Sequence, residues 1–387
     1  MNRKDLVTKS LSSLCSLIVD CPHSTPRWTN SGKIVVRNNN IKNGKIDLSN
    51  PSFTDEEHFS QRIKRATPQY PDIIITREAP MGEVGMVPEK IECCLGQRMV
   101  LLRPDSSLID PHYLLYILQT QYVQHQISWS EGTGTTVSNL RIPHLKDLQI
   151  PMVEMDMQRK MVSTIKVIDE KSDLNRSINE SLLMQAKSVF DKYYRAANDK
   201  QKFTTLINIM GGGTPKTSNH DFWNGDIPFF TPKDVGAPYT FQTEKSITES
   251  GLANCNSRLY PSNTTFVTAR GTVGKVGIAG NPMAMNQSCY ALVSDTIDPI
   301  LVYFYAHKVV DSLKHKASGA VFDAIVTRDF EVESINILNK DVSDEVLSIV
   351  TPMMEAIHNN AKENLLLSTL KDTLLPKLMS GELDVMS

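Results

Sequence analysis

The sequence predicts an α+β fold in which two strand-rich modules alternate with two long helices that pair as an antiparallel coiled coil. Three observations support this prediction. Short matches recur in the same order in both halves of the 387-residue chain, each half carries brief apolar runs between turn residues, and each half ends in a long heptad-like stretch. The length is sufficient for two or three domains with their own cores.

An internal repeat accounts for most of the chain. The segment TREAPMGEVG (76–85) resembles TARGTVGKVG (268–277), and STP (24–26) resembles GTP (213–215). Further matches are Gln97 with Gln287, Asp110-Pro111 with Asp298-Pro299, and GTTVSNL (134–140) with GAVFDAI (319–325). The shared order of these matches predicts a diverged duplication with loop insertions.

The first part of each half, residues 10–153 and 203–340, is expected to consist mainly of short strands and turns. Apolar and β-branched runs lie there between clusters of Gly, Pro, Asn and Asp; they are KIVV, DIIIT, RMVLL, IPFF, TTFVTA and CYALV. HYLLYIL (112–118) and LVYFYAHKVV (301–310) predict buried helices at matched places. The predicted domains are residues 1–153 (first module), 154–200 (first helix), 201–340 (second module) and 341–387 (second helix).

The two long helices are expected over residues 156–197 and 343–379. Their apolar residues recur in steps of three and four, which is typical of a coiled-coil seam. The first stripe is Met157, Met161, Ile165, Ile168, Ile178, Leu182, Val189 and Tyr193, and the second is Val346, Val350, Met353, Ile357, Leu367, Leu370, Leu374 and Leu378. Each helix would be about 60 Å long at about 1.5 Å per residue, and each needs a partner to bury its stripe. Antiparallel pairing would place the two modules at opposite ends.

Polar residues interrupt both stripes near their middles: Asn175 and Asn179 in the first, Asn360 and Asn364 in the second. One interpretation is that polar residues are tolerated there because solvent is near. The other is register control, because the asparagines meet only when the two helices are aligned at their centres. Pro352 lies inside the second stripe and predicts a kink, or a helix that begins again there.

Composition restricts the class of protein. Hydrophobic residues make up 40% of the chain and charged residues 22%, as in ordinary globular proteins, and the net charge is −2. Any nucleic-acid site must therefore be a local basic patch. The six cysteines form no CxxC pair, which favours a reducing cytoplasm over a zinc site. With no run of eighteen apolar residues and no cleavage pattern, we expect neither a signal peptide nor a membrane span.

Enzymatic motifs are incomplete. The glycines of GGGTPKT (211–217) suggest a phosphate loop, but Lys216 follows Pro215 rather than Gly, and Lys275 is followed by Val276. NPMA (281–284) falls short of the motif of amino-methyltransferases. A nuclease-like pair of Asp72 and Glu78 lacks the expected Lys, and there is no HExxH. A self-contained methyltransferase or nuclease is therefore disfavoured.

A binding function fits the residues better. Residues 21–46 contain five Lys or Arg and no acidic residue, and Arg62, Lys64 and Arg65 add a second basic group. Arg and Lys suit guanine edges and phosphates, and Asn suits adenine edges. The candidate DNA-binding residues are Arg27, Lys33, Arg37, Asn38, Asn39, Arg77, Arg98, Lys216, Thr217, Ser218, Asn219, Lys233, Arg270, Lys275 and Gln287. The alternative is a solvated face with turn asparagines, and core packing is favoured for Trp223 and Phe222.

The stretch GGGTPKTSNHDFWNGDIPFFTPKDVG (211–236) resembles the opening of a target recognition domain in the DNA-specificity subunits of type I restriction–modification systems. LLPKLMSGEL (374–383) resembles the end of that family's spacer helix, and TARGTVGKVG with the later Asn286-Gln287 also fits. The resemblance covers essentially the whole chain and is strongest in the second half. In the first half, PHSTP (22–26) replaces the glycine-rich opening and REAPMG (77–82) replaces the usual Arg-Gly run.

The resemblance implies a non-catalytic subunit without a cofactor of its own. Each target recognition domain would read one half of a bipartite DNA target in the major groove. The helices would set the spacer and dock two methyltransferase subunits that carry S-adenosylmethionine. Motor-nuclease subunits, with ATP and Mg²⁺, would complete the restriction enzyme. The alternative is a non-enzymatic protein-binding scaffold with a coiled-coil dimeriser.

Overall fold

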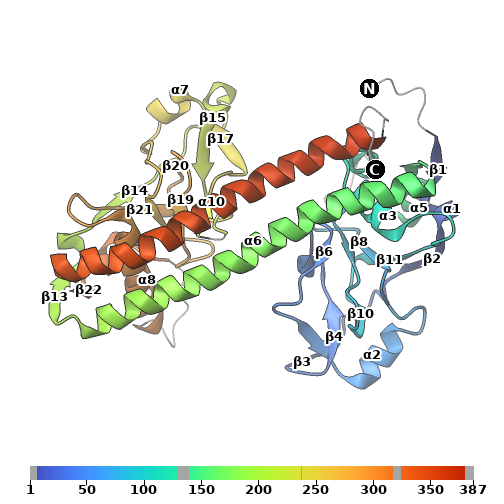
Figure 1. The fold of residues 1–387 in the computed structure, drawn as a ribbon, viewed down its shortest axis with the longest axis horizontal. Helices are drawn as coiled ribbons and strands as arrows, with labels where there is room; N and C mark the ends of the chain where they lie inside the picture. Colours follow the sequence, from blue (N-terminus) through green and yellow to red (C-terminus); the bar gives the residue numbers. More distant parts are fainter. Residues whose placement is uncertain (1–6, 130–138, 237, 317–323, 380–387) are drawn as a thin grey trace. The chain divides into compact units, whose positions relative to one another are not determined.

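The computed structural model describes residues 7–129, 139–236, 238–316 and 324–379. The chain forms two compact units, Met1–Glu170 with Leu367–Ser387, and Lys171–Leu366. Helices α6 (Met155–Ala196) and α10 (Lys340–Met379) each contribute a stretch to both units. The α+β class and the two long helices packed together are confirmed (Figure 1). The domain limits at residues 153, 200 and 340 stay predictions.

The first unit contains two four-stranded sheets, ordered β10-β4-β7-β3 and β2-β11-β8-β9. Their strands are β2 (Cys15–Asp20), β3 (Trp28–Thr29), β4 (Lys33–Val36), β7 (Ser52–Thr54), β8 (Ile73–Thr76), β9 (Val84–Met86), β10 (Cys93–Leu95) and β11 (Met99–Pro104). Short ladders join β1 (Thr8–Ser10) with β12 (Gln149–Pro151), and β5 (Ile41–Lys42) with β6 (Lys45–Ile46). The helices are α1 (Leu11–Leu14), α2 (Glu56–Arg62), α3 (Pro111–Leu118), α4 (Gln121–Ser128) and α5 (Ile142–Asp147).

The apolar runs of this unit are buried on both faces of a sheet. In β8, Ile73 and Ile75 belong to the cluster around α3, whereas Ile74 belongs to the cluster beneath β4 and β10. Successive side chains of a strand point to opposite faces, so a continuous isoleucine run indicates a strand covered on both sides. This explains why DIIIT shows no alternation of polar residues.

The second unit contains a five-stranded sheet, β14-β21-β18-β19-β16, and a three-stranded sheet, β17-β15-β20. The strands are β14 (Asn208–Gly211), β15 (Trp223–Phe230), β16 (Tyr239–Thr240), β17 (Lys245–Ile247), β18 (Thr265–Thr268), β19 (Val276–Ala279), β20 (Ala284–Met285) and β21 (Cys289–Val293), with β13 (Asp199–Lys202) paired to β22 (Ser334–Ile337). The helices are α7 (Glu249–Ala253), α8 (Pro299–Lys316) and α9 (Thr327–Glu331). The predicted buried helices at 112–118 and 301–310 are confirmed as α3 and α8.

The internal repeat is confirmed in the hairpins β8–β9 and β18–β19. In both hairpins, a Thr hydroxyl accepts a hydrogen bond from the backbone N–H seven residues later, at 3.0 and 2.9 Å, and a glycine with positive φ lies between them. The residues are Thr76, Gly82 and Glu83 in the first hairpin, and Thr268, Gly274 and Lys275 in the second. The matched segments 134–140, 319–325 and 374–383 lie partly outside the described residues.

The heptad pattern locates the helices but misplaces part of each seam. Ile178 and Leu370 are 39% and 45% exposed, so their predicted seam positions are wrong. The buried positions are instead Ala186 and Phe190 in α6, and Met354 and Leu375 in α10; Val189 and Tyr193 are only partly buried. A straight helix drifts relative to a 3.5-residue repeat, so a stripe extrapolated over five heptads leaves the contact face.

Helix α10 continues through Pro352, so the expectation that a new helix begins there is wrong. Pro352 is exposed, and Val350 and Met354 on either side are fully buried. Proline removes one backbone donor from the helix. Burial of the neighbouring side chains outweighs that loss, because each of them contributes about 1.5–3 kcal/mol.

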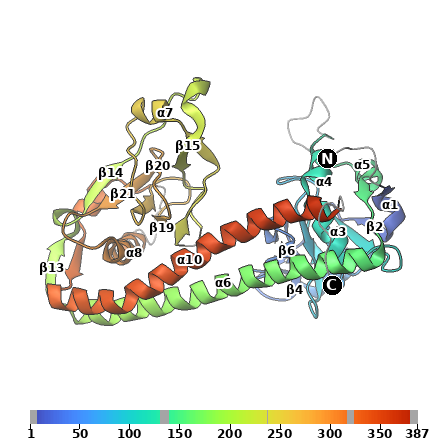
Figure 2. The same cartoon turned by 45° about the horizontal axis from the view of Figure 1, so that its top comes forward.

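The asparagines of the two stripes meet in pairs within the second unit. Asn360 Nδ2 donates to Asn179 Oδ1 at 2.8 Å, and Asn175 Nδ2 donates to Asn364 Oδ1 at 3.0 Å. Residue numbers rise along α6 as they fall along α10, so the helices are antiparallel here (Figure 2). Glu363 also accepts from Asn175, at 2.7 Å. These polar contacts are satisfied in this alignment, and their role in fixing the register stays a prediction.

Replacing Asn360 with Leu is expected to destabilise the chain by about 1–3 kcal/mol, because buried Asn179 loses its donor. The double variant Asn179→Leu/Asn360→Leu should recover most of that loss, since two apolar partners replace a broken polar pair. Urea unfolding measures both effects. Asn359→Leu is the matched control, because Asn359 is exposed on the same turn. Equal stability of Asn359→Leu and Asn360→Leu would contradict a structural role for the pair.

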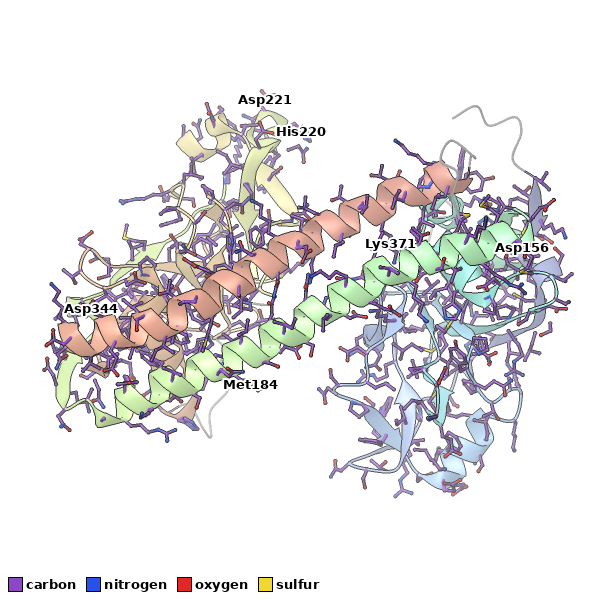
Figure 3. The ribbon with its side chains drawn as sticks, viewed as in Figure 1. Asp156, Met184, His220, Asp221, Asp344 and Lys371 are labelled. Carbon is purple, nitrogen blue, oxygen red and sulfur yellow. The ribbon has the colours of Figure 1, made fainter. Side chains whose placement is uncertain are left out.

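In the first unit, a charged contact joins the two helices. Lys371 Nζ lies 3.0 Å from Asp169 Oδ1 and 4.7 Å from the ring centroid of Tyr116 on α3. Figure 3 shows Lys371 on the stretch of α10 beside α6. Burial, reinforced by the charge of Asp169, raises the pKa of Tyr116 above its usual range. Through these two contacts, Lys371 joins the last turns of α10 to α6 and to α3.

Candidate nucleic-acid interface

Four turns of the second unit meet and form what we call the second turn cluster: residues 212–215, 231–234, 269–274 and 286–288. Backbone contacts hold them together across large sequence separations. The hydrogen bonds are Asn286 N to Phe230 O (2.9 Å), Ala269 N to Ser288 O (2.7 Å) and Thr272 Oγ1 to Pro232 O (3.2 Å). The glycine-rich opening, the TPKD turn, the hairpin turn and the Asn-Gln turn are therefore one structural site.

The glycines of the opening allow a close backbone approach. A Cβ on Gly212 would lie 2.1 Å from Asn286 O, and one on Gly213 would lie 2.6 Å from Asn256 N. Gly211 has nothing within 4 Å of that position. The next residue, Thr214, donates its hydroxyl to Gln287 Oε1. Gly212 is thus needed for packing against the 286–288 turn, and Gly213 for packing against Asn256.

Most candidate side chains of this unit are exposed: Lys216, Thr217, Ser218, Lys233, Arg270, Lys275 and Gln287. Asn219 is partly buried and caps the short helix at His220–Phe222 by accepting from Asp221 N at 3.2 Å. Lys233 forms an ion pair with Glu244 at 3.2 Å. Within the described residues, no ion pair engages Lys216, Arg270 or Lys275.

Trp223 packs into the module. Its ring lies 5.5 Å from that of Phe229, and it contacts the small apolar cluster that contains Ile247. The indole Nε1 donates to Lys216 O at 3.4 Å, which is at the long limit of a hydrogen bond. Trp223 thus supports the 216–219 turn from beneath, in agreement with the favoured core-packing interpretation. His220 and Asp221, labelled in Figure 3, follow this turn.

The first unit builds an equivalent site, the first turn cluster: residues 22–26, 37–40, 77–82 and 96–98. The hydrogen bonds that join its turns are Gly96 N to Val36 O (2.7 Å), Arg77 N to Arg98 O (2.8 Å), Asn38 Nδ2 to Glu78 O (2.6 Å) and Gln97 Nε2 to Thr25 Oγ1 (3.4 Å). The same Gln and Thr positions are hydrogen-bonded in both units, although the Gln97 amide donates in the first and the Thr214 hydroxyl donates in the second. The backbone frame is the same in both units although the turn sequences differ.

The first-unit candidates fall into two groups. Arg27, Arg37, Asn39 and Arg98 are exposed. The others are engaged internally. Arg77 donates to Leu140 O at 2.9 Å and to Asp20 at 3.0 Å, with only 13% of its side chain exposed. Asn38 bridges two turns. A hydrogen bond to Glu92 raises the pKa of Lys33 above its usual value and ties its ammonium to that acid.

Arg62 is a buried structural residue and is not part of a basic surface. It is 6% exposed and donates to Ser24 O at 2.8 Å and to Gly96 O at 2.9 Å. Arg62 thereby joins the 22–26 turn to the 96–98 turn. The sequence places Arg62 in a basic group with Lys64 and Arg65, and nothing in that pattern separates a buried arginine from its exposed neighbours. The predicted surface role of Arg62 is wrong.

Four of the six cysteines, Cys21, Cys93, Cys94 and Cys289, are buried, and Cys15 and Cys255 are partly buried. Burial raises the pKa of Cys15 and Cys93 to about 12 and that of Cys94 to about 11, so these thiols stay protonated at neutral pH. In the described parts of the chain, no group of three or more His, Cys, Asp or Glu could hold a metal ion. Nor is any described helix long and apolar enough to cross a membrane.

A chain that presents the same frame of turns twice, with different exposed side chains on each, is a protein of two equivalent modules. The comparisons with known proteins agree. The family model described as type I restriction modification DNA specificity domain matches residues 25–184 and 199–367. The chain belongs to this family and is a DNA specificity (S) subunit of a type I restriction–modification system, a non-catalytic subunit.

Individual relatives show the same relationship. The specificity subunit of type I restriction enzyme MjaIX from Methanocaldococcus jannaschii is 27% identical over 172 residues, which cover 43% of this chain and 40% of that protein. The HindI specificity subunit of Haemophilus influenzae is 20% identical over 372 residues, covering 75% of this chain and 81% of that one. The crystal structure of the type I system S subunit from M. genitalium has 17% identity, covers 98% of this chain and 97% of its own, and has a TM-score of 0.54, a likeness of fold.

Proposed function

We propose that each turn cluster reads one half of a bipartite duplex DNA target in the major groove. The observation that carries this proposal is the shared frame: the Gln97–Thr25 and Gln287–Thr214 contacts recur in units whose exposed turn residues differ. Phosphate contacts position a protein on DNA, and side chains that reach base edges specify the sequence. Two copies of one frame with different side chains suit two different half-sites.

The paired helices are proposed to set the distance between the half-sites and to dock methyltransferase subunits. Half-sites that face the same side of a duplex lie roughly 34–36 Å apart, one helical turn. Helix α6, with 42 residues, is about 60 Å long at about 1.5 Å per residue, which is enough to span that distance. The satisfied asparagine pairs support a single fixed alignment of the helices, as a spacer requires.

The chain is proposed to act in the cytoplasm without a cofactor of its own. S-adenosylmethionine would be held by two methyltransferase subunits, and ATP and Mg²⁺ by motor-nuclease subunits. The incomplete phosphate-loop spacing at residues 211–217 supports this division. Chemistry would take place in the partners, and this subunit would choose the site.

One variant in each module tests the bipartite proposal. Arg37→Ala in the first cluster and Lys216→Ala, directly after the 212–215 turn of the second cluster, are compared because both side chains are exposed. The complex assembled with methyltransferase subunits should methylate duplexes altered in one half-site about 10–100-fold less than the intact target. Each variant should reduce this discrimination for one half-site only. Loss at both half-sites with either variant would contradict separate reading.

The same assay addresses the scaffold alternative. If the assembled complex shows no preference for any duplex over a range of moderate salt concentrations, while the chain still binds its partner subunits, a protein-binding scaffold becomes the better interpretation. Wild-type chain is the control in every arm. A split preference that moves with one variant supports the proposed function.

A further inference from the structure

The two turn clusters differ in how their cations are paired. In the first unit, every candidate Lys or Arg except Arg37 lies against an acid. The pairs are Arg27 with Asp55 (3.9 Å), Lys33 with Glu92 (2.5 Å), Arg77 with Asp20 (3.0 Å) and Arg98 with Glu78 (3.3 Å). Arg37 lies 5.2 Å from the ring centroid of Trp28. The first unit therefore carries acidic partners for most of its candidate cations.

The hairpin turns show the same difference at matched positions. The turn of the first unit carries Glu78 and Glu83, and the corresponding positions of the second unit are Arg270 and Lys275. Glu78 is held by Arg98 and accepts from Asn139 Nδ2 at 2.7 Å. Arg270 and Lys275 are exposed, and no described acid lies within ion-pair distance of either. One frame thus carries an acidic turn in the first unit and a basic turn in the second.

A third cation reaches the basic turn from α8. A Cβ on Gly274 would lie 2.7 Å from Lys314 Cε and 3.5 Å from its Nζ, so the Lys314 ammonium lies over the turn. Lys314 is exposed, and no described residue forms an ion pair with it. In the first unit, the matching Gly82 faces the neutral side chains of Gln124 and Ile127 instead.

The neighbouring basic residues of α8 do not belong to this group. Lys308 is bound to Asp191 at 2.5 Å, and Lys316 is bound to buried Glu333. Burial first, and then the charges of nearby lysines, lowers the pKa of His307 to about 3, so His307 carries no charge at neutral pH. The positive charge available to a ligand at this turn is therefore that of Arg270, Lys275 and Lys314.

We propose that the second module is the phosphate anchor of the subunit: Arg270, Lys275 and Lys314 bind backbone phosphates of duplex DNA, and the first module contributes little salt-dependent affinity. The inference rests on the proposed function and adds that the two modules contribute unequally to phosphate binding. Each cation that neutralises a phosphate releases condensed counterions, with a salt slope of about 0.9 per phosphate. Cations already paired with acids, as in the first unit, release fewer because the acids repel the same phosphates.

The test is the salt dependence of target binding by the complex with methyltransferase subunits. The variant Arg270→Gln/Lys275→Gln/Lys314→Gln should lower the slope of log affinity against log salt by about three. The matched first-unit variant Arg27→Gln/Arg37→Gln/Arg98→Gln should lower it by about one, from Arg37. Lys314→Gln alone should lower it by about one, and Lys314→Arg should restore it. Thermal unfolding of each variant, unchanged from wild type, shows that the chain still folds.

The outcomes separate the two proposals. An equal or larger slope change in the first-unit variant, or an unchanged slope in Lys314→Gln, overturns the anchor while leaving sequence-specific binding intact. Absence of any half-site preference in the wild-type complex overturns the proposed function itself. A slope change about three times larger in the second-unit variant than in the first-unit variant, with discrimination at both half-sites retained in the second-unit variant, supports the anchor.

Discussion

Replacing Gly212 with Ala is expected to destabilise the second unit by about 3 kcal/mol or more. The new Cβ would lie 2.1 Å from Asn286 O and 2.7 Å from Met285 O, and both contacts are with backbone that cannot rotate away. The 212–215 turn would have to leave the 286–288 turn, and the contact of Thr214 with Gln287 would be lost. The second half-site should then no longer be read.

Hydrogen exchange measures this effect locally. Amides of β14, β20 and β21 should exchange about 100-fold faster in Gly212→Ala, while strands of the first unit keep their wild-type rates. Gly211→Ala is the matched control, because nothing lies within 4 Å of its Cβ position. If both variants exchange at wild-type rates, the close approach of the two turns is not required for the fold of this unit.

Replacing Phe190 with Ala is expected to cost about 3–5 kcal/mol. Phe190 is 1% exposed, and its ring lies 5.1 Å from that of Phe304 and 5.3 Å from that of Tyr305. It is the largest fully buried side chain of α6. Its removal would leave a cavity at the point where the helix is anchored to the second module.

Urea unfolding of the chain tests this prediction. Met184→Ala is the control, because Met184 lies on α6 with 68% of its surface exposed and should change stability by less than about 0.5 kcal/mol (Figure 3). A loss in Phe190→Ala no larger than in Met184→Ala would show that α6 is not held by this aromatic cluster. If Phe190→Ala, but not Met184→Ala, binds methyltransferase subunits more weakly, the packing of α6 against α8 is also needed for assembly of the complex.

The repeat, the strand runs and the long helices follow from the sequence because they depend on local pattern. Apolar periodicity identifies α6 and α10, and the order of short matches identifies the two equivalent units. The glycine run at 211–213 predicts a special turn. The contacts that require it, Gly212 with Asn286 and Gly213 with Asn256, join residues too far apart in the sequence for local pattern to show.

Local sequence pattern does not show which side chains are buried and which are exposed. Arg77 and Arg98 look equivalent in sequence, yet one guanidinium is enclosed by Asp20 and Leu140 while the other is 58% exposed. Ile178 fits the heptad pattern and is exposed, because its neighbour Asn179 faces α10. Lys314 belongs to no sequence motif. It lies at the hairpin turn because α8 packs beside that turn. Such contacts depend on tertiary structure that periodicity does not encode.

The most direct test of bipartite reading is a genome-wide map of methylated adenine in cells that express this chain with its methyltransferase partner. A single split motif with a fixed gap is expected from the wild-type chain. Exchange of exposed second-cluster residues should alter one half of that motif and leave the other half and the gap unchanged. An undivided motif, or a change in both halves after substitutions in one unit, would contradict two modules reading two half-sites.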